Sequence, residues 1–336
     1  MSTDSRRDET RQSVSEVRYS IVITCYNQQE FIKDAIESVL LQKCTSKEVI
    51  VVDDGSQDGS LEVLQRYGVG LRLLALPTNC GVSEARNRGA AIARGKYLIF
   101  LDGDDLFTPW ALDVYEKLIA ERRPTTILSG ARWFEGQVPL LREHDGAPKR
   151  LEFVEYESLM AKVKDRGNGM YLGASVISQQ AFHDVGGWSP GIWHLDGHDL
   201  CARLAYSGNA VLVLTPYTML YRMHAANSIR SVLPFVRAAH VIMDRERAGQ
   251  YSGARSRRFE RYVHHGGTIF FCMKRALCVG LYRGAFGLAA RGWTMIMAAI
   301  VSKSIVRLKG RRRVQTYELR RQGSVARTTW LRAAVR

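Results

Sequence analysis

Four short apolar runs, each followed at once by a polar cluster, recur across residues 20–105 of this chain. Apolar residues recur at helical spacing between these runs, most clearly from Phe31 to Leu40. Strands that alternate with helices at this length predict an α/β fold with a parallel sheet and right-handed crossovers. Asn27 is a suitable N-cap for the first helix, and Thr108-Pro109 would open a later one. The expected strands are 20–24, 48–52, 71–76 and 97–101, and the expected helices are 31–40, 58–67, 82–93 and 109–122.

The polar clusters fall at the carboxyl ends of the expected strands. In open parallel sheets ligands bind beyond these ends, so we expect a binding site where four strand ends converge. The glycine-rich phosphate loops G-x-G-x-x-G and G-x-x-x-x-G-K are absent after the first strand. A metal ion and a basic residue, with Arg86 the best candidate, would therefore neutralise the phosphates of a nucleotide. The clusters are 24–27, 53–56, 79–81 and 102–105.

The last of these runs ends in three aspartates, Asp102, Asp104 and Asp105. Carboxylates this close repel one another, and a divalent cation between them would remove the repulsion. Mg²⁺ and Mn²⁺ take oxygen ligands, usually one or two carboxylates plus substrate phosphates. Side chains alternate along a strand, so Asp102 and Asp104 should point the same way. The sequence favours a metal site here, and the alternative is a solvated acidic turn.

Four motifs in this region resemble those of family 2 glycosyltransferases. They are T-C-Y-N at 24–27, V-V-D-D-G-S-Q-D-G-S at 51–60, N-C-G-V-S-E-A-R-N-R-G at 79–89 and F-L-D-G-D-D at 100–105. The resemblance spans residues 18–230. It implies a GT-A fold, in which a Rossmann-like, mostly parallel sheet is flanked by helices, and an inverting transfer of sugar from a nucleoside diphosphate sugar.

The resemblance implies roles on the donor side of the site. Asp53 and Asp54 would face the nucleotide base and ribose, and the alternative is a turn cap. Arg86 and Asn87 would hold the base or the diphosphate, and the alternative is a solvated helix face. Asp104 would bind Mn²⁺ or Mg²⁺, which acts as a Lewis acid on the departing diphosphate. Further donor or metal contacts would come from Thr24, Tyr26, Asn27 and Asp102.

Later motifs resemble the acceptor side of the family. V-G-G-W at 185–188 contains Gly187, whose backbone could approach the donor sugar closely, and Trp188, which would stack on a sugar or belong to the core. Residues 173–175 resemble the strand before this loop. Y-R-M-H at 221–224 implies that Arg222 and His224 approach the diphosphate and the metal, and the alternative for His224 is a structural histidine.

The catalytic base is where the sequence departs from the family pattern. An inverting transfer needs a base that deprotonates the acceptor hydroxyl, and the family supplies it from an E-D-x-D-L-x-x-R motif. Here the segment reads D-G-H-D-L-C-A-R at 196–203, so Gly197 occupies the position of the usual base. We expect Asp196 to replace it, with His198 as the second choice. Asp199 is a further option that fits a structural cap better, and a chain with no base would be weakly active or inactive.

Charge is distributed unevenly along the chain, whose formal net charge is +15. Residues 237–336 carry 22 Lys+Arg and 4 Asp+Glu, a net of +18, whereas residues 1–236 have a net charge of −3. Apolar helical faces with interspersed cations, as in 259–308, are typical of helices in a membrane interface. We expect an anionic membrane surface as partner, and the alternative is packing on the catalytic domain. Nucleic acid is not expected, because no recognition motif accompanies the charge.

These features predict three regions. Residues 1–17 lack an apolar signal segment and would be disordered. Residues 18–230 would form the GT-A domain, with a nucleotide-sugar half (18–106) and an acceptor half (107–230), and 231–336 would form a basic helical extension. The sequence contains no run of 18 uncharged apolar residues, so we expect no membrane-spanning helix. The six cysteines are scattered and form no C-x-x-C pair, which indicates a reducing compartment. We expect a cytoplasmic protein, peripheral on the cytoplasmic face of the membrane.

The expected activity is metal-dependent transfer of a single sugar, from a UDP-sugar in the first instance. The acceptor would be a hydroxyl of a lipid-linked or cell-surface glycan, as in polysaccharide biosynthesis for the cell envelope. The processive-synthase signature Q-x-x-R-W is absent, which favours one sugar per encounter. The alternative, motivated by Gly197, is a catalytically impaired GT-A protein that binds or scaffolds at a membrane surface.

Overall fold

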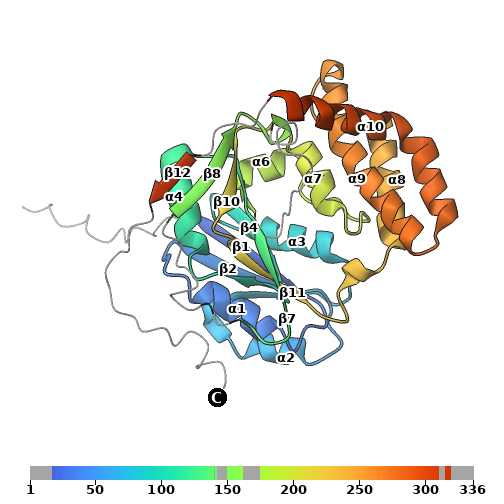
Figure 1. Ribbon diagram of the computed structural model, residues 1–336. Helices are drawn as coiled ribbons and strands as arrows, with labels where there is room; N and C mark the ends of the chain where they lie inside the picture. Colours follow the sequence, from blue (N-terminus) through green and yellow to red (C-terminus); the bar gives the residue numbers. More distant parts are fainter. Residues whose placement is uncertain (1–16, 140, 142–149, 162–174, 310–314, 319–336) are drawn as a thin grey trace, which may run out of the picture.

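The computed structural model describes residues 17–139, 141, 150–161, 175–309 and 315–318, which form an α/β fold around a central sheet (Figure 1). Nine strands of these residues make up the sheet, in the order β12-β8-β10-β6-β9-β4-β1-β2-β3. The half β3-β2-β1-β4 is parallel, whereas β9 and β8 run antiparallel to their neighbours. The strands are β1 (Tyr19–Cys25), β2 (Lys47–Asp53), β3 (Arg72–Ala75), β4 (Tyr97–Asp102), β6 (Thr126–Leu128), β8 (Arg150–Tyr156), β9 (Val176–Ser178), β10 (Ala210–Thr215) and β12 (Gln315–Glu318).

Both faces of the central sheet are covered by helices. Ile21 and Ile23 of β1 belong to an apolar core with α1 and α4, whereas Val22 belongs to a second core with α3, α6 and α7. Burial on both faces explains why these strands read as unbroken apolar runs. The helices are α1 (Ile32–Leu40), α2 (Ser60–Gln65), α3 (Val82–Ala91), α4 (Ala111–Arg122), α6 (Gln179–Asp184) and α7 (Asp196–Arg203), with 3-10 turns at Gly68–Gly70, Ser228–Arg230 and Arg255–Arg257.

A smaller sheet, in the order β5-β11-β7, lies next to the aspartate-rich end of β4. Its strands are β5 (Leu106–Phe107), β7 (Ala131–Glu135) and β11 (Met219–Met223). Because β5 begins directly after Asp105 and pairs antiparallel with β11, the Y-R-M-H motif is brought beside the aspartates.

Three helices, α8 (Leu233–Arg247), α9 (Arg258–Cys278) and α10 (Tyr282–Lys309), pack together at one end of the molecule (Figure 1). Their apolar core also contains Leu195 and Ala202, so this helical unit packs on α7. Gly266 lets α9 and α10 approach closely, because a Cβ there would overlap the backbone of Met295. One face of this helical unit therefore packs on the rest of the protein, as one of the two alternatives predicts. After α10 the chain returns to the central sheet, where β12 pairs with β8. The domain boundary at residue 230 stays a prediction.

Several element boundaries differ from the prediction. Helix α2 begins at Ser60 instead of Asp58. The Asp58 carboxylate accepts a hydrogen bond from the Ser60 amide (2.9 Å), and such a local side-chain bond competes with helical structure at residue 58. Helix α4 begins at Ala111 rather than at Pro109. The stretch 259–308 is two helices, separated at Gly280, whose φ of 77° few other residues adopt. The predicted disorder of 1–16 and the strand residues 173–174 lie outside the described residues.

Helix α10 is long and apolar enough to cross a membrane within Tyr282–Ser302, where an 18-residue stretch has a mean hydropathy of 1.4. This differs from the expectation of no spanning segment, because Arg283 and Arg291 interrupt the apolar run without making it polar overall. In the fold 39% of this stretch is buried. Length and composition alone do not separate a spanning helix from a core helix.

Candidate active site

The polar ends of β1, β2 and β4 lie side by side at one edge of the central sheet. Parallel pairing places Cys25 opposite Asp53 and Thr24 opposite Asp102. The 79–81 loop joins them, because Asp54 accepts hydrogen bonds from the backbone amides of Cys80 and Gly81 (2.8 and 2.9 Å). The predicted convergence of four polar clusters is therefore present in the structure.

The aspartates that follow β4 are crowded. Asp102, Asp104 and Asp105 each place a carboxylate oxygen within 4.8 Å of the others. Burial raises the pKa of Asp104, and the charge of Asp102 raises it further. The pKa of Asp105 is raised well above its ordinary value by burial and by the charges of Asp104 and Asp102. A hard divalent cation would relieve this repulsion, so the cluster fits Mn²⁺ or Mg²⁺.

His224 reaches the same cluster from the end of β11. Its Nε2 lies 2.9 Å from Oδ2 of Asp104, and its ring packs on Phe31 with the centroids 4.6 Å apart. The side chain of Asn227 also approaches this oxygen (3.4 Å) and accepts a hydrogen bond from the His224 amide. Asp104 and His224 are thus adjacent, as a shared metal requires. Asn227 follows the Y-R-M-H motif by three residues and belongs to the same segment that resembles the family, and the structure adds its contact with Asp104.

Arg222 lies beside the cluster, but its guanidinium is fully engaged by the protein. Nη2 donates to Asp34 (2.8 Å) and Nε to the backbone oxygen of Asp104 (3.1 Å), between two phenylalanine rings. The Arg222 amide donates to Oδ1 of Asp105 (3.0 Å). In this structure Arg222 positions the aspartate turn through these contacts, and its expected bond to a diphosphate stays a prediction. No sequence motif marks Asp34, its partner.

Arg86 of α3 bridges two carboxylates from distant parts of the chain. Its Nη2 donates to Asp102 and its Nη1 to Asp196, each at 2.6 Å. The guanidinium also lies over the indole of Trp188, 4.5 Å from the ring centroid. Burial alone would lower the pKa of Arg86, but the charges of the two aspartates raise it overall. A guanidinium that stays charged beside the aspartate cluster fits the predicted role of Arg86 in neutralising phosphates.

The two leading candidates for the catalytic base face opposite ways. Asp196, in the first turn of α7, reaches the sheet edge through its bond to Arg86. The His198 ring instead faces α9, with Nε2 2.9 Å from His265 and Nδ1 3.1 Å from the hydroxyl of Thr268. Burial and two neighbouring histidines lower the pKa of His198 well below its ordinary value. His198 is therefore wrong as a base candidate, whereas Asp196 is well placed.

Asp199 is fully buried and has a structural role, as its position predicts. Burial would raise its pKa, but the charge of Arg203 and the other donors hold that pKa below its ordinary value. Arg203 also donates to two carbonyls of the V-G-G-W loop (2.6 Å each). Asp199 thereby joins this loop to α7 and α8. Its four side-chain donors are Ser189 (2.7 Å), Arg203 (2.9 Å), Arg245 (2.8 Å) and Tyr251 (2.9 Å).

The neighbouring carboxylates Asp53 and Asp54 differ in their partners. Both oxygens of Asp54 are engaged by the 79–81 loop, so Asp54 builds the wall of the site. Asp53 is buried, and its Oδ2 accepts a hydrogen bond from the Ser56 amide (3.1 Å). Its Oδ1 accepts no hydrogen bond from any part of the chain that the structure describes. A nucleotide base N–H could supply the missing donor, so the predicted base contact depends on Asp53.

The first motif contributes three different environments. The Thr24 hydroxyl lies 3.4 Å from an oxygen of Asp102, and Tyr26 is exposed. Asn27 is not the predicted helix cap, because α1 begins only at Ile32 and Asn27 has a left-handed φ of 52°. Its Oδ1 accepts a hydrogen bond from the backbone of the second motif (2.7 Å), so it joins the two loops.

Asn87, Gly187 and Trp188 form one contact. The Asn87 amide donates to and accepts from the backbone of Trp188 (2.8 Å each), and a Cβ on Gly187 would lie 2.7 Å from Oδ1 of Asn87. Asn87 therefore holds this loop, and its expected contact with the nucleotide stays a prediction. Trp188 is 3% exposed and packs edge-on against Phe100, so of its two alternatives the structure shows the core tryptophan.

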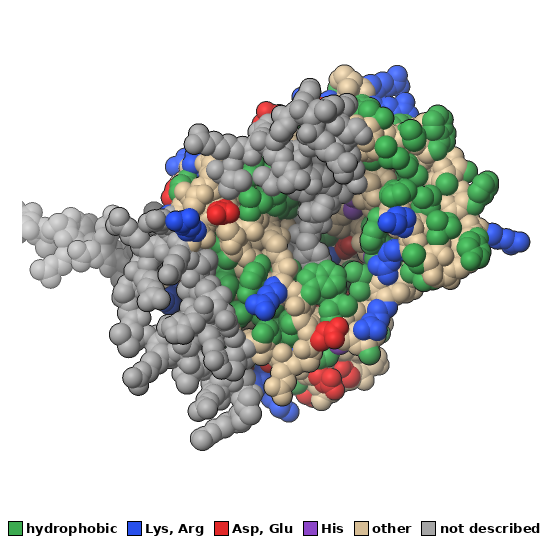
Figure 2. Space-filling view, in the orientation of Figure 1, with side chains coloured by type: hydrophobic (Ala, Val, Ile, Leu, Met, Phe, Trp, Pro, Cys, Tyr) green, Lys and Arg blue, Asp and Glu red, His purple; other side chains and the backbone are tan. Residues whose placement is uncertain are grey.

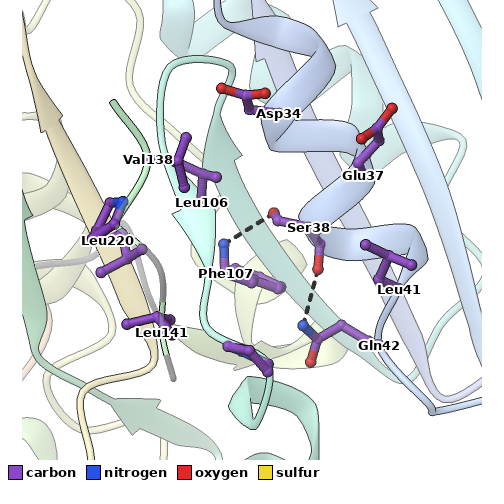
Figure 3. Close-up of a pocket in the computed structure, with 12 residues that line it drawn as sticks. Asp34, Glu37, Ser38, Leu41, Gln42, Leu106, Phe107, Val138, Leu141 and Leu220 are labelled. Atoms are coloured by element: carbon purple, nitrogen blue, oxygen red, sulfur yellow. Dashed lines mark hydrogen bonds between the residues drawn. The ribbon is translucent and has the colours of Figure 1, made fainter. Parts of the chain in front are cut away.

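A cavity of about 70 Å³ lies on the other side of the aspartate turn, between α1 and β5 (Figure 3). Its lining is mostly apolar and includes none of the clustered aspartates. The Ser38 hydroxyl accepts a hydrogen bond from the Phe107 amide at its wall (3.0 Å). A cavity of this size cannot hold a nucleotide, whose pockets are several times larger.

Comparison with known sequences identifies a family for the part of the chain that carries the four motifs. The family described as "Glycosyl transferase family 2" matches residues 20–186. The chain is 38% identical over 105 residues to the glycosyltransferase YibD of Escherichia coli (strain K12), an alignment that covers 30% of this chain and 29% of YibD. Alignments with three such relatives span between 29% and 39% of their lengths.

Solved structures share the fold at low sequence identity. TarS of S. aureus (residues 1–349, in complex with UDP-GlcNAc) matches with a TM-score of 0.56 and 17% identity, covering 87% of this chain and 92% of that chain. The mannosyltransferase PcManGT of Pyrobaculum calidifontis, in complex with GDP-Man and Mn²⁺, matches with a TM-score of 0.51 and 16% identity, covering 87% of each chain. The GT-A type of fold predicted from the motifs is confirmed.

Proposed function

Because this chain belongs to glycosyl transferase family 2 through residues 20–186, we propose that it transfers a sugar from a nucleoside diphosphate sugar to an acceptor hydroxyl. The observation that carries the proposal is the crowded aspartate cluster with His224 beside it, at the edge where four motifs converge. Two proteins of the same fold form complexes with UDP-GlcNAc, or with GDP-Man and Mn²⁺, which supports a metal-dependent sugar-nucleotide donor.

The donor side divides between metal-binding and nucleotide-binding residues. Asp104, Asp102 and His224 would hold Mn²⁺ or Mg²⁺, and the cation would stabilise the charge of the departing diphosphate as a Lewis acid. Oδ1 of Asp53 would accept a hydrogen bond from the base, and Arg86 would neutralise phosphate charge. A UDP-sugar is the first donor to try, since the TarS complex contains one.

Asp196 is the general base of the proposed inverting displacement. The acceptor oxygen attacks the anomeric carbon as the bond to the diphosphate breaks, and the acceptor proton passes to the Asp196 carboxylate. Without donor, Arg86 holds this carboxylate in an ion pair. A diphosphate that competes for Arg86 would free Asp196, so that the base becomes available when the donor is bound.

A glycan or glycolipid is the proposed acceptor, and the cytoplasmic face of a membrane is the proposed location. The net charge of +18 in residues 237–336 supports an anionic surface as partner. Gly197 at the usual position of the base supports the second candidate, a GT-A protein that binds donor without turning it over. The position of Asp196 beside Arg86 favours the enzyme.

The test is donor turnover by the purified chain with UDP-, GDP- and dTDP-sugars, with Mn²⁺, with Mg²⁺ and with EDTA. We expect metal-dependent turnover of one donor and a loss of about a thousandfold in Asp104→Ala, since the metal supplies several kcal/mol. Asp113→Ala, which removes an exposed aspartate on α4, is the matched control. Neither metal-dependent binding nor turnover would contradict the proposal, and binding without turnover of any donor would favour the second candidate.

A further inference from the structure

We infer that α10 docks this protein on an anionic lipid surface by lying flat in the membrane interface, with one apolar stripe inserted and without spanning the bilayer. The inference rests on the proposed function for its cellular setting. Its residues lie outside the active site, so it can be tested separately.

The outward face of α10 is apolar along most of its length. Phe286, Trp293 and Met297 are 75%, 62% and 49% exposed, and Ala290 and Ile300 are exposed as well. They follow one another at three or four residues, which places them on one helix face. We call these five residues the α10 stripe. Figure 2 shows hydrophobic side chains gathered over the C-terminal helices.

The turn between α9 and α10 extends this apolar surface. Val279 in the turn and Tyr282 at the start of α10 are 56% and 69% exposed, and Leu277 near the end of α9 is 46% exposed. Monomeric soluble proteins seldom expose adjoining large apolar side chains in this number, and such patches mark interaction sites. Two phenylalanines on α9, Phe270 and Phe271, are exposed as well (39% and 49%).

Charge identifies the partner as an anionic lipid surface. From Arg261 to Tyr317 the chain has eleven Lys or Arg and no Asp or Glu. Lys274 and Arg283 are exposed beside the turn. Apolar side chains with cations at their margin match acyl chains beneath anionic headgroups. A second copy of the chain fits less well, because a symmetric contact through this face would bring like charges together.

The inward face of α10 explains why the helix lies flat. Gly292 packs against Ile269 and Met243, and Gly266 of α9 touches the α10 backbone at Met295. Spanning the bilayer would break these contacts and carry Arg291, near the middle of the Tyr282–Ser302 stretch, into hydrocarbon, where a charge is costly. A flat helix keeps its inward face packed and only the stripe in contact with lipid.

Vesicle binding by the full chain tests the surface. We expect binding to phosphatidylcholine vesicles that contain phosphatidylglycerol, and weak binding to phosphatidylcholine alone or at high salt. Phe286→Ser with Trp293→Ser should weaken binding at least about tenfold, and Arg283→Ser about fivefold. Val69→Ser and Arg66→Ser, exposed residues near the end of α2, are matched controls that should bind like wild type.

The depth of Trp293 separates a flat helix from a spanning one. A spanning helix would place this residue near the bilayer centre, whereas a flat one places it close to the headgroups. Lipids brominated near the headgroup should therefore quench its fluorescence more than lipids brominated at the chain ends, with Trp293→Phe giving the background from the other tryptophans.

Three results would overturn the inference. They are deeper quenching by chain-end bromines, vesicle binding unaffected by the stripe substitutions, and stripe variants that only dissociate a dimer in sedimentation. Intact vesicle binding without turnover of any donor would count against the proposed function and leave the docking surface standing.

Discussion

The sheet edge and the C-terminal helices use buried charge in opposite ways. At the edge, three aspartates crowd together, and burial with mutual repulsion raises the pKa of Asp104 and Asp105. Beside the helices, Asp199 lies between Arg203 and Arg245, and Glu246 accepts two hydrogen bonds from Nε of Arg261 (2.9 and 3.2 Å). Repulsion that the neighbouring donors offset only in part marks a place for a ligand, whereas a carboxylate whose pKa is held low by paired arginines marks packing.

Asp196→Asn should give the largest effect and test the sheet edge as a site of chemistry. An amide cannot take the acceptor proton, so transfer should fall about 10²- to 10⁴-fold. Donor affinity should change little, because the amide oxygen can still face Arg86. Transfer rates and donor titration by calorimetry measure the two quantities.

His198→Gln is the matched control for this experiment. Its ring nitrogens face α9, so we expect transfer close to wild type. A large loss in His198→Gln with none in Asp196→Asn would reverse the assignment of the base.

Asp199→Ala tests the paired charges of the helical side. It leaves two partly buried arginines without their carboxylate partner, which should lower the free energy of unfolding by about 2–4 kcal/mol. Urea denaturation measures this loss. Asp244→Ala removes an aspartate of α8 whose side chain is 57% exposed, and it should cost about 1 kcal/mol or less. Equal stability of the two variants would contradict the distinction between paired core charge and surface charge.

The two exposed cysteines provide one reporter for each region. Burial and the neighbouring Asp54 carboxylate, 3.0 Å from its Sγ, raise the pKa of Cys80 to about 12. At neutral pH its thiolate fraction is about a thousandfold below that of an unperturbed thiol. Iodoacetamide should therefore modify Cys278, at the end of α9, well before Cys80, as followed by mass spectrometry.

Asp54→Asn removes the charge beside Cys80 and should speed its modification. Faster labelling of Cys80 than of Cys278 in the wild type would show that the Asp54 carboxylate does not suppress the reactivity of the Cys80 thiol.

The sequence was most informative where function depends on local motifs. The motifs at the strand ends predicted the polar sheet edge, the aspartate cluster at the end of β4 and Asp53 at the end of β2, because each motif directly follows its own strand. It was least informative about long-range partners: Asp34 and Arg222 are 188 residues apart, and His198 and His265 are 67 apart. No spacing rule reports such pairs. The direction of His198 could have been anticipated, since residues two apart on a helix point to nearly opposite sides.

The smallest effect concerns the histidines that join α7 to the C-terminal helices. His198 stacks on His264 (3.9 Å between centroids) and bonds to His265, which lies 3.5 Å from Glu246. Burial and the other two histidines lower the pKa of His198 well below its ordinary value, so the folded state excludes a proton that the unfolded chain takes up near pH 6.5. The associated stability is complete above that pH and is lost as the pH falls below it, by up to about 1.4 kcal/mol per pH unit.

Urea denaturation measures how the free energy of unfolding changes between pH 7.5 and 5, roughly the titration range of histidine. The lowered pKa values of Asp199 and Glu246 act only at lower pH, where carboxylates protonate. His194 and His240 are shifted in the same direction as His198, so the slope of wild type must be compared with that of His198→Asn. A shallower slope in the variant would show that a neutral His198 stabilises this junction. Equal slopes in wild type and His198→Asn would show that His198 does not cause the pH dependence of stability.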